Sequence, residues 1–517
     1  MRTISLFTAL FLASLMLIAQ EQTFIKEYTY NASEIDSKVS CRAIAINQLR
    51  SLLLNEIGVY VQSESILKTS DVSGKFSQDF VENIATISAG VTKLEVLQET
   101  WNGETFWMKA SITVDKKNLE ESLKQLIQDR QKLKELNETR QQLSEATKEI
   151  NRLRKELLTK DKKTDSTLMR LNISKYNNEI KSLNAANYII NGRNKLWKED
   201  FVGAIEDFTK AIELDPKSET YKNRGIAKQG LLDYKGSISD FTKAIQINPK
   251  DSYLYYSRGN SKYSLKEYEA AIEDFTNAIE LNPIDIISYY FRGFSKQDLN
   301  DQPGAIEDFT KTIELVESNI ISDDFTFIVL KEKFKKSNHL YFSRGISKYL
   351  FRDDIGAISD FTKAIEINPN DALSYESRAR ARGRLKDYER SMKDVSKAIE
   401  LNPKYGEAYF FRAQLKTVLV DDVGSIADYT KAIELNPKDA ASYEGRGRSK
   451  FALHDFRGAV EDFSIVISLT TNSGNIYFLR GLSKFFLNQK ASSCQDFSKA
   501  GELGYAEAYD AIRKYCN

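Results

Sequence analysis

Residues 252–283 read SYLYYSRGNSKYSLKEYEAAIEDFTNAIELNP, and variants of this stretch fill about two thirds of the chain. With Ser252 as position 1, Gly259 falls at position 8, Phe275 at position 24 and Pro283 at position 32. The aspartate at position 23 recurs at Asp207, Asp240, Asp274, Asp308, Asp360, Asp394, Asp428, Asp462 and Asp496. Successive steps are 33 or 34 residues, apart from one step of 52. A period kept over nine units indicates a repeat array built from one supersecondary element.

The small, aromatic and proline positions of this unit resemble the tetratricopeptide repeat, a helix–turn–helix element of about 34 residues. The resemblance implies a mainly α protein in which residues 167–517 form an α-solenoid of nine repeats. Gly259 lets the two helices of one repeat approach closely, and Pro283 ends the second helix. An aspartate at position 16 of seven repeats predicts the N-cap of the second helix: Asp200, Asp233, Asp301, Asp353, Asp387, Asp421 and Asp455.

The array departs from its period after repeat four and at its end. An insertion occupies residues 320–337, and its helical spacing of apolar residues predicts an extra helix over Asp323–Lys336. Residues 505–516 are expected to form a helix that caps repeat nine. That helix would bring Cys494 and Cys516 together, so we predict a disulfide between them and a buried free thiol at Cys41.

Residues 1–19, MRTISLFTALFLASLMLIA, have the basic start, apolar run and small final residue of a secretory signal peptide. The run is short for a membrane span. We therefore expect an exported protein, periplasmic or secreted, with no integral membrane span in the mature chain.

Residues 20–117 are predicted to form a small α+β domain. The expected order is a strand at Phe24–Tyr30, a helix at Glu34–Glu56 ended by Gly58, a strand at Val59–Ile66, a helix at Phe76–Ile87, and a hairpin of Thr92–Trp101 with Glu104–Val114 around Asn102-Gly103. This order resembles small envelope modules of bacterial lipoproteins and flagellar accessory proteins.

Residues 118–166 are predicted to form a long charged helix followed by a polar linker. Leucines and isoleucines between Leu119 and Leu157 recur at steps of three, four and seven, which resembles a coiled-coil seam. Self-association through residues 118–158 is therefore an open possibility. It leads to the alternative function, a structural envelope protein that assembles through this helix.

Candidate chemistry is scarce. The chain has two histidines, three cysteines and a net charge of +1, so we expect no metal site, no cofactor and no nucleic-acid partner. No catalytic motif is present, and we do not expect an enzyme.

Two ladders of charge remain to be explained. Arginine at position 7, from Arg224 to Arg480, and a basic residue at position 11, from Lys195 to Lys484, could form a polyanion-binding stripe. The alternative, which the equal charge totals favour, is that each arginine pairs with the nearby aspartate of position 23.

A binding groove is predicted from the first helices of the repeats. In tetratricopeptide proteins, positions 2, 5, 9 and 12 line the ligand groove. By resemblance, these are Tyr253, Tyr256, Asn260, Tyr263, Tyr290, Phe294, Phe342, Tyr349, Phe410, Phe451, Phe478 and Phe485. Exposed aromatic side chains dominate binding hot spots, although some of these rings could instead pack against neighbouring helices. The sequence thus predicts an exported scaffold or adaptor that binds protein or peptide partners in the groove, most of all in repeats three to five.

Overall fold

The computed structural model describes residues 21–63, 92, 94–115, 130–159, 166–318, 320, 325–470 and 473–516. The predicted signal peptide, the predicted helix at 76–87 and the first part of the charged helix lie outside the described residues. None of the described helices combines the length and the hydropathy that crossing a bilayer would require.

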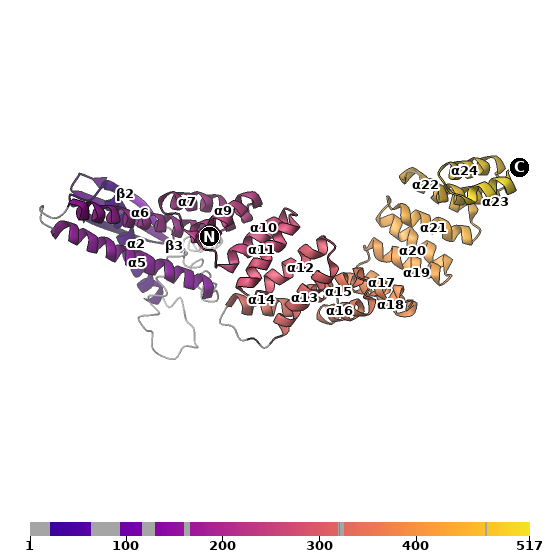
Figure 1. Ribbon diagram of the computed structural model, residues 1–517, viewed down its shortest axis with the longest axis horizontal. Coiled ribbons are helices and arrows are strands. Elements are labelled where there is room, and N and C mark those ends of the chain that lie inside the picture. Colours follow the sequence, from indigo (N-terminus) through magenta and orange to yellow (C-terminus); the bar gives the residue numbers. More distant parts are fainter. Residues whose placement is uncertain are drawn as a thin grey trace, which may run out of the picture. The chain divides into compact units, whose positions relative to one another are not determined.

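The described chain is mainly helical, with one small sheet in its N-terminal part (Figure 1). Its elements are β1 (Glu21–Asn31), α2 (Lys38–Ser63), β2 (Leu94–Trp101), β3 (Thr105–Asp115), α5 (Arg130–Thr159), α6 (Ser166–Trp197), α7 (Phe201–Leu214), α8 (Ser218–Gly230), α9 (Tyr234–Ile247), α10 (Ser252–Ser264), α11 (Tyr268–Leu281), α12 (Ile286–Asp298), α13 (Gln302–Glu317), α14 (Phe325–Lys335), α15 (His339–Leu350), α16 (Asp354–Ile367), α17 (Ala372–Arg384), α18 (Tyr388–Leu401), α19 (Gly406–Val418), α20 (Asp422–Leu435), α21 (Ala440–Ala452), α22 (Phe456–Leu469), α23 (Gly474–Phe486), α24 (Lys490–Glu502) and α25 (Glu507–Tyr515).

These elements divide into two compact bodies, which we describe separately. The first body spans Met1–Ser288 and Ser322–Ile328, and the second spans Tyr289–Ile321 and Val329–Asn517. Repeats one to three belong to the first body, and repeats five to nine belong to the second. The boundary falls in the first turn of α12, so that nearly all of repeat four lies in the second body.

The sheet of the first body has the strand order β1-β3-β2, and both pairings are antiparallel. The predicted turn joins β2 to β3. Asn102 Oδ1 accepts hydrogen bonds from the backbone N–H groups of Glu104 and Thr105 at 3.0 and 2.7 Å. Gly103 has a φ of 97°, a conformation that glycine adopts without strain. The hairpin prediction is therefore confirmed.

The prediction that Gly58 ends the first helix is wrong. Helix α2 continues to Ser63, so the residues from Val59 to Ser63 are helical instead of extended. Leu49, Leu53 and Ile57 are fully buried at helical spacing, and their contacts carry the helix up to the glycine. A glycine inside a helix costs only about 1 kcal/mol relative to alanine, less than the burial of one large aliphatic side chain provides.

The apolar side chains of α5 that resembled a coiled-coil seam are buried within this protein chain. Leu143, Ile150, Leu153 and Leu157 are buried in one hydrophobic core with residues of the sheet, α2 and α6. Figure 1 shows α2, α5 and α6 beside the strands. Within the described residues, the apolar stripe that resembled a coiled coil therefore serves this core.

Helix α6 joins this core to the repeats. It runs without a break from Ser166 to Trp197, so the segment predicted as a helix before repeat one and the first helix of that repeat are one continuous helix. Arg50 of α2 donates to Asn187 of α6 at 2.7 Å and to Asn191 at 3.3 Å. The α+β region and repeat one thus share a core and buried polar contacts.

In seven of the nine repeats, an aromatic ring of the second helix lies on a glycine of the first helix, whereas repeats six and seven have Ala379 and Ala413 at that position. A Cβ atom added at Gly259 would lie 2.9 Å from Phe275 Cε1, and one added at Gly293 would lie 2.9 Å from Phe309 Cε1. In these two repeats a side chain at position 8 would meet the ring, so the ring or the helix would have to shift. The fully buried ring at position 24 is therefore the packing partner that the glycine accommodates.

The seven predicted N-caps are confirmed. Each aspartate at position 16 accepts a hydrogen bond from the backbone N–H three residues later, as in Asp200 with Gly203 at 3.0 Å and Asp421 with Gly424 at 2.9 Å. Such bonds satisfy amide groups that the first turn of a helix leaves unpaired.

The residue before each cap has a left-handed backbone, which the sequence did not suggest. Position 15 has φ between 59° and 69° in Glu199, Leu232, Lys266, Asn300, Arg352, Lys386, Val420, His454 and Asn488. In each turn the backbone N–H of position 16 donates to the carbonyl of position 11, as Asp421 N does to Lys416 O at 2.8 Å. This bond closes the turn and fixes the strained residue. A β-branched residue such as Val420 is the least suited to this conformation.

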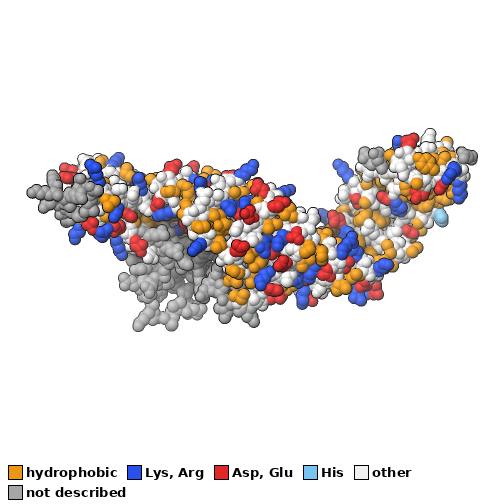
Figure 2. All heavy atoms as spheres, viewed as in Figure 1, with side chains coloured by type: hydrophobic (Ala, Val, Ile, Leu, Met, Phe, Trp, Pro, Cys, Tyr) orange, Lys and Arg blue, Asp and Glu red, His pale blue; other side chains and the backbone are white. Residues whose placement is uncertain are grey.

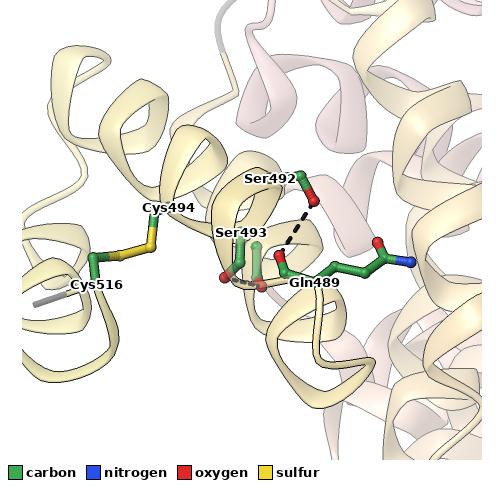
Figure 3. The surroundings of a disulfide bond; sticks show 6 residues. Gln489, Ser492, Ser493, Cys494 and Cys516 are labelled. Atoms are coloured by element: carbon green, nitrogen blue, oxygen red, sulfur yellow. Dashed lines mark hydrogen bonds between the residues drawn. A yellow bond between two sulfur atoms is a disulfide. The ribbon is translucent and has the colours of Figure 1, made fainter.

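The end of the array is closed by α25 and by a disulfide between Cys494 of α24 and Cys516, whose Cα atoms are 5.7 Å apart (Figure 3). Cys494 follows Ser493, whose hydroxyl donates to the carbonyl of Gly481 on α23 at 2.8 Å. Cys41 is a free, buried cysteine. Burial and the neighbouring Asp36 raise the pKa of the Cys41 thiol to about 11.

Candidate functional site

The arginine ladder is a structural network, as the pairing alternative predicted. Arg258 Nε and Nη2 donate to the two carboxylate oxygens of Asp274 at 2.9 and 2.6 Å. Lys262 Nζ lies 2.8 Å from the same carboxylate, whose side chain is 1% exposed. The arrangement recurs in repeats two to nine, with Arg382 in place of lysine in repeat six. Because the aspartates are buried, these are not the exposed ion pairs of a helix surface.

Charges on the visible surface are likewise mixed. Figure 2 shows basic and acidic side chains interspersed over the face in view. No segregated basic stripe on that face matches the polyanion alternative, and the arginines of position 7 are already engaged. The inner-face positions 2, 5, 9 and 12 are therefore the remaining candidates for binding.

In the first body, the inner-face rings lie close to one another and to ring partners. Tyr253 is 43% exposed, and its ring centroid is 6.0 Å from that of Tyr256. Tyr256 in turn lies 6.3 Å from the buried Phe275, and burial raises the pKa of its phenol. Tyr263 contacts Tyr268 at 5.5 Å. Asn260 is half-buried.

Repeats one and two present ion pairs at the same positions. Arg193 Nη2 lies 3.1 Å from Glu219 Oε1, and Lys222 Nζ lies 2.7 Å from Glu219 Oε2. The ammonium of Lys222 also lies 5.7 Å from the centroid of the Tyr253 ring. The inner face therefore changes from charged to aromatic between repeats two and three.

In the second body, the rings at position 5 rest on the second helix of their own repeat. Tyr290 lies 6.1 Å from Phe309, and Phe342 lies 5.8 Å from Phe361. Phe294, at position 9, lies 5.2 Å from Phe309. These half-buried rings therefore have a packing role in addition to the surface that they present.

The remaining predicted rings of the second body have close partners within the chain. Each is half-buried. The guanidinium of Arg384 lies 3.5 Å from the ring centroid of Tyr349. Three further rings have aromatic partners, with the distance between ring centroids in parentheses: Phe451 with Phe456 (5.3 Å), Phe478 with Tyr505 (4.9 Å) and Phe485 with Tyr515 (4.3 Å). The last two contacts involve the C-terminal cap, so Phe478 and Phe485 are packing partners of the end of the array.

A cavity of about 500 Å³ lies in the second body around Phe410. Its lining residues come from four helices and two connections, and they combine apolar and charged groups: Arg380, Lys404, Tyr405, Gly406, Glu407, Phe410, Ala432, Leu435, Asn436, Asp439 and Ala441. Phe410 is the predicted groove residue that this cavity contains. Arg380, Glu407 and Ala441 also occupy inner-face positions of repeats six, seven and eight.

Arg380 is held in place at the cavity by two neighbours. Its Nε donates to Glu376 Oε1, and its guanidinium lies 4.9 Å from the centroid of Phe411. Its two terminal nitrogens make no hydrogen bond to the described residues. Glu376 is 3% exposed, and burial raises the pKa of its carboxyl group despite the adjacent arginine. The hydroxyl of Tyr405 donates to Glu376 at 3.4 Å.

Sequence reasoning missed Glu376, Arg380, Lys404 and Tyr405 because it searched for repeated aromatic residues. A signal was present, since repeat six has glutamate and arginine at positions 5 and 9 where repeat four has Tyr290 and Phe294. The cavity lies in repeats six to eight, and the expected centre of the groove lay in repeats three to five.

Stacked helix pairs that recur with one period, each joined by a turn with a left-handed residue at position 15, define a helical-repeat protein. Residues 252–285 and 372–405 match family models described as tetratricopeptide repeat. Together with the recurrent helix pairs of the structure, these matches show that the chain contains tetratricopeptide repeats.

Solved structures with the same kind of fold include the C-terminal part of a repeat protein from Cytophaga hutchinsonii, which is 20% identical with a TM-score of 0.40 and aligns over 49% of this chain and 98% of that one. A tetratricopeptide repeat protein from Parabacteroides merdae is 20% identical with a TM-score of 0.34, over 58% and 98%. YrrB, described as having an unusual peptide-binding site, is 18% identical with a TM-score of 0.33, over 39% and 95%. A search of curated proteins finds no significant match to the chain.

Proposed function

We propose that this chain is an exported scaffold that binds a protein or peptide partner through the inner-face positions of its repeats. The observation that carries the proposal is the cavity at Phe410, where an aromatic ring and a fixed guanidinium line the same space. A volume of about 500 Å³ is in the range of sites that hold a ligand side chain or a small molecule.

The lining favours a peptide segment that carries an apolar residue beside a charged or polar one. Phe410, Ala432 and Leu435 supply apolar surface, whereas Lys404 and Glu407 are exposed charges at the margin. Exposed marginal charges act on the choice of partner and on the rate of association more than on the affinity. No catalytic step is part of the proposal.

The test uses the full chain and a displayed library of random peptides. Peptides selected on the wild-type protein should lose binding to a Phe410→Leu variant and change sequence preference with Lys404→Glu. Lys397→Glu is the matched control, because Lys397 is an exposed lysine of α18 outside the cavity that pairs with Glu400. Unchanged selection with both cavity variants would place the binding surface elsewhere.

Export is a separate part of the proposal and rests on residues 1–19. Mass spectrometry of the mature native protein should find a chain that begins after Ala19. A native chain that retains Met1–Ala19 would remove export from the proposal and leave partner binding unaffected.

A further inference from the structure

The inner face of repeat four has a ring from outside the repeat lying on it. Phe334 of α14 contacts Tyr290 of α12 with ring centroids 4.9 Å apart and planes at 69°. Tyr290 also meets Phe294 edge to face at 4.7 Å, and both rings lie against Phe309. In repeat five, by comparison, the corresponding Phe342 lies on the ring of Phe361 from its own repeat.

Helix α14 is not part of the stack that it lies beside. Helix α13 packs directly against α15, so repeats four and five meet across the insertion. Arg344 donates to Thr310 at 3.2 Å and Gln297 donates to Ser347 at 3.0 Å, which joins the two repeats by polar contacts. The array therefore does not depend on α14 for its continuity.

The C-terminal part of α14 has one side on the repeat and the other in solvent. Leu330 and Phe334 are half-buried, whereas Glu332, Lys333 and Lys335 are exposed. Besides the ring contact, Lys331 Nζ donates to the carbonyl of Ser318 at the end of α13. This is the pattern of a helix that seats an aromatic anchor in an apolar site and keeps its charges in water.

We propose that the inner face of repeat four is a docking site for a helix that presents an aromatic ring, and that α14 is its resident occupant. The site then opens to a partner helix of the same chemistry when Phe334 leaves Tyr290, so α14 competes with the partner. This inference rests on the proposed function, because it assigns one kind of ligand to one stretch of the inner face.

The probe is a labelled synthetic peptide of residues 325–337, FTFIVLKEKFKKS, and the readout is fluorescence anisotropy with the full chain. A Phe334→Ala chain should bind the peptide at least roughly tenfold more tightly than the wild-type chain, the effect of one aromatic anchor. The same peptide carrying Phe334→Ala should not bind. Lys333→Ala in the chain is the matched control and should behave as wild type. Equal binding to the wild-type and Phe334→Ala chains, including no binding to either, would overturn the proposal.

A second measurement on the wild-type chain covers the case in which Phe334→Ala does not fold, which circular dichroism would reveal. Saturating peptide should displace α14 and speed tryptic cleavage at Lys331, Lys333 and Lys335. Peptide that binds without faster cleavage of α14 would overturn the inference. So would the absence of binding at the highest peptide concentration used. Because this probe reports repeat four and the displayed library reports the cavity at Phe410, either proposal can fail while the other stands.

Discussion

Arg50 Nη1 donates to Asn187 Oδ1 at 2.7 Å, and the two residues are 137 positions apart in the chain. Arg50 is 8% exposed, and burial lowers the pKa of its guanidinium to about 10. Among the described residues it hydrogen-bonds to Asn187 and Asn191 and to no carboxylate. A buried cation with amide partners thus fixes α2 against the helix that opens the repeat array.

This contact predicts an asymmetric result when its two partners are removed in turn. Asn187→Leu leaves the buried charge without its nearest acceptor and should destabilise the first body by about 3 kcal/mol. Arg50→Met removes the charge itself and should cost less, and the double variant should recover part of the loss caused by Asn187→Leu. Denaturant unfolding measures all three.

The alkylation rate of the Cys41 thiol offers an independent measure of how the Asn187→Leu and Arg50→Met variants change the first body. With a pKa of about 11 and a buried position, it should resist alkylation at pH 8 in the folded protein. Asn187→Leu should speed its labelling more than Arg50→Met does. Equal labelling rates in the two single variants would contradict the assigned role of the buried charge.

The buried ion network inside the repeats should contribute far more to folding stability than the ion pairs on their surface. Asp428 is held by Arg412 at 2.7 Å and by Lys416 at 2.8 Å, with its side chain 6% exposed. Asp428→Ala removes the buried carboxylate that the two cations share and should cost about 3 kcal/mol. The control is Lys431→Ala, which breaks an exposed pair with Glu434 on the same helix and should leave the melting temperature nearly unchanged. Similar losses in thermal melts of the two variants would refute this distinction.

Val420 should be a site where a substitution stabilises the protein. Its φ is 62° and it is 81% exposed, so it has backbone strain and little packing to compensate. Val420→Asn should stabilise by about 1 kcal/mol, because asparagine tolerates this conformation far better than a β-branched residue. Val423→Asn, at a 71% exposed position within α20, should give no gain. A lower melting temperature for Val420→Asn would show that the valine has a contact of its own.

The repeat architecture could be predicted because the contacts that define each repeat join residues close together in the sequence. An aspartate caps the amide three residues later, and a glycine faces a ring 16 residues on, as Gly259 faces Phe275. Each relationship returns in seven of the nine repeats. The position of the insertion and the approach of Cys494 to Cys516 follow from the same counting.

What could not be predicted depends on contacts between distant segments. Gly58 looks like a helix end until the core around Ile57 is known, and the seam of α5 looks like an oligomer interface until α2 and α6 are seen to cover it. The cavity at Phe410 could not be predicted from the sequence for the same reason. Arg380 becomes a site residue only when Glu376 and Phe411 hold it beside a ring from the next repeat.

The buried seam makes a prediction about self-association. Ile150 and Leu153 are each 1% exposed, so a second copy could use them only if α5 left the core. The protein should therefore show no dimer that Ile150→Ala or Leu153→Ala dissociates, and each variant should instead lose stability by about 2–5 kcal/mol. Light scattering combined with thermal melts separates the two outcomes. A concentration-dependent dimer that either variant abolishes without lowering the melting temperature would support assembly through this helix.

The disulfide should stabilise the end of the array and little else. It closes a loop with a sequence separation of 22 residues, for which chain entropy predicts about 3 kcal/mol. Tyr515 lies against Phe485 at 4.3 Å, and Cys516 follows it directly, so the bond holds the ring that covers repeat nine. Cys494→Ser should therefore raise hydrogen exchange in α23, α24 and α25 and leave the first body unchanged. Reductant should reproduce the effect in the wild-type chain and add nothing in Cys494→Ser, because Cys516 then lacks its disulfide partner and Cys41 is a free, buried thiol. Unaltered exchange in α23–α25 of the variant would mean that α25 is held by packing alone.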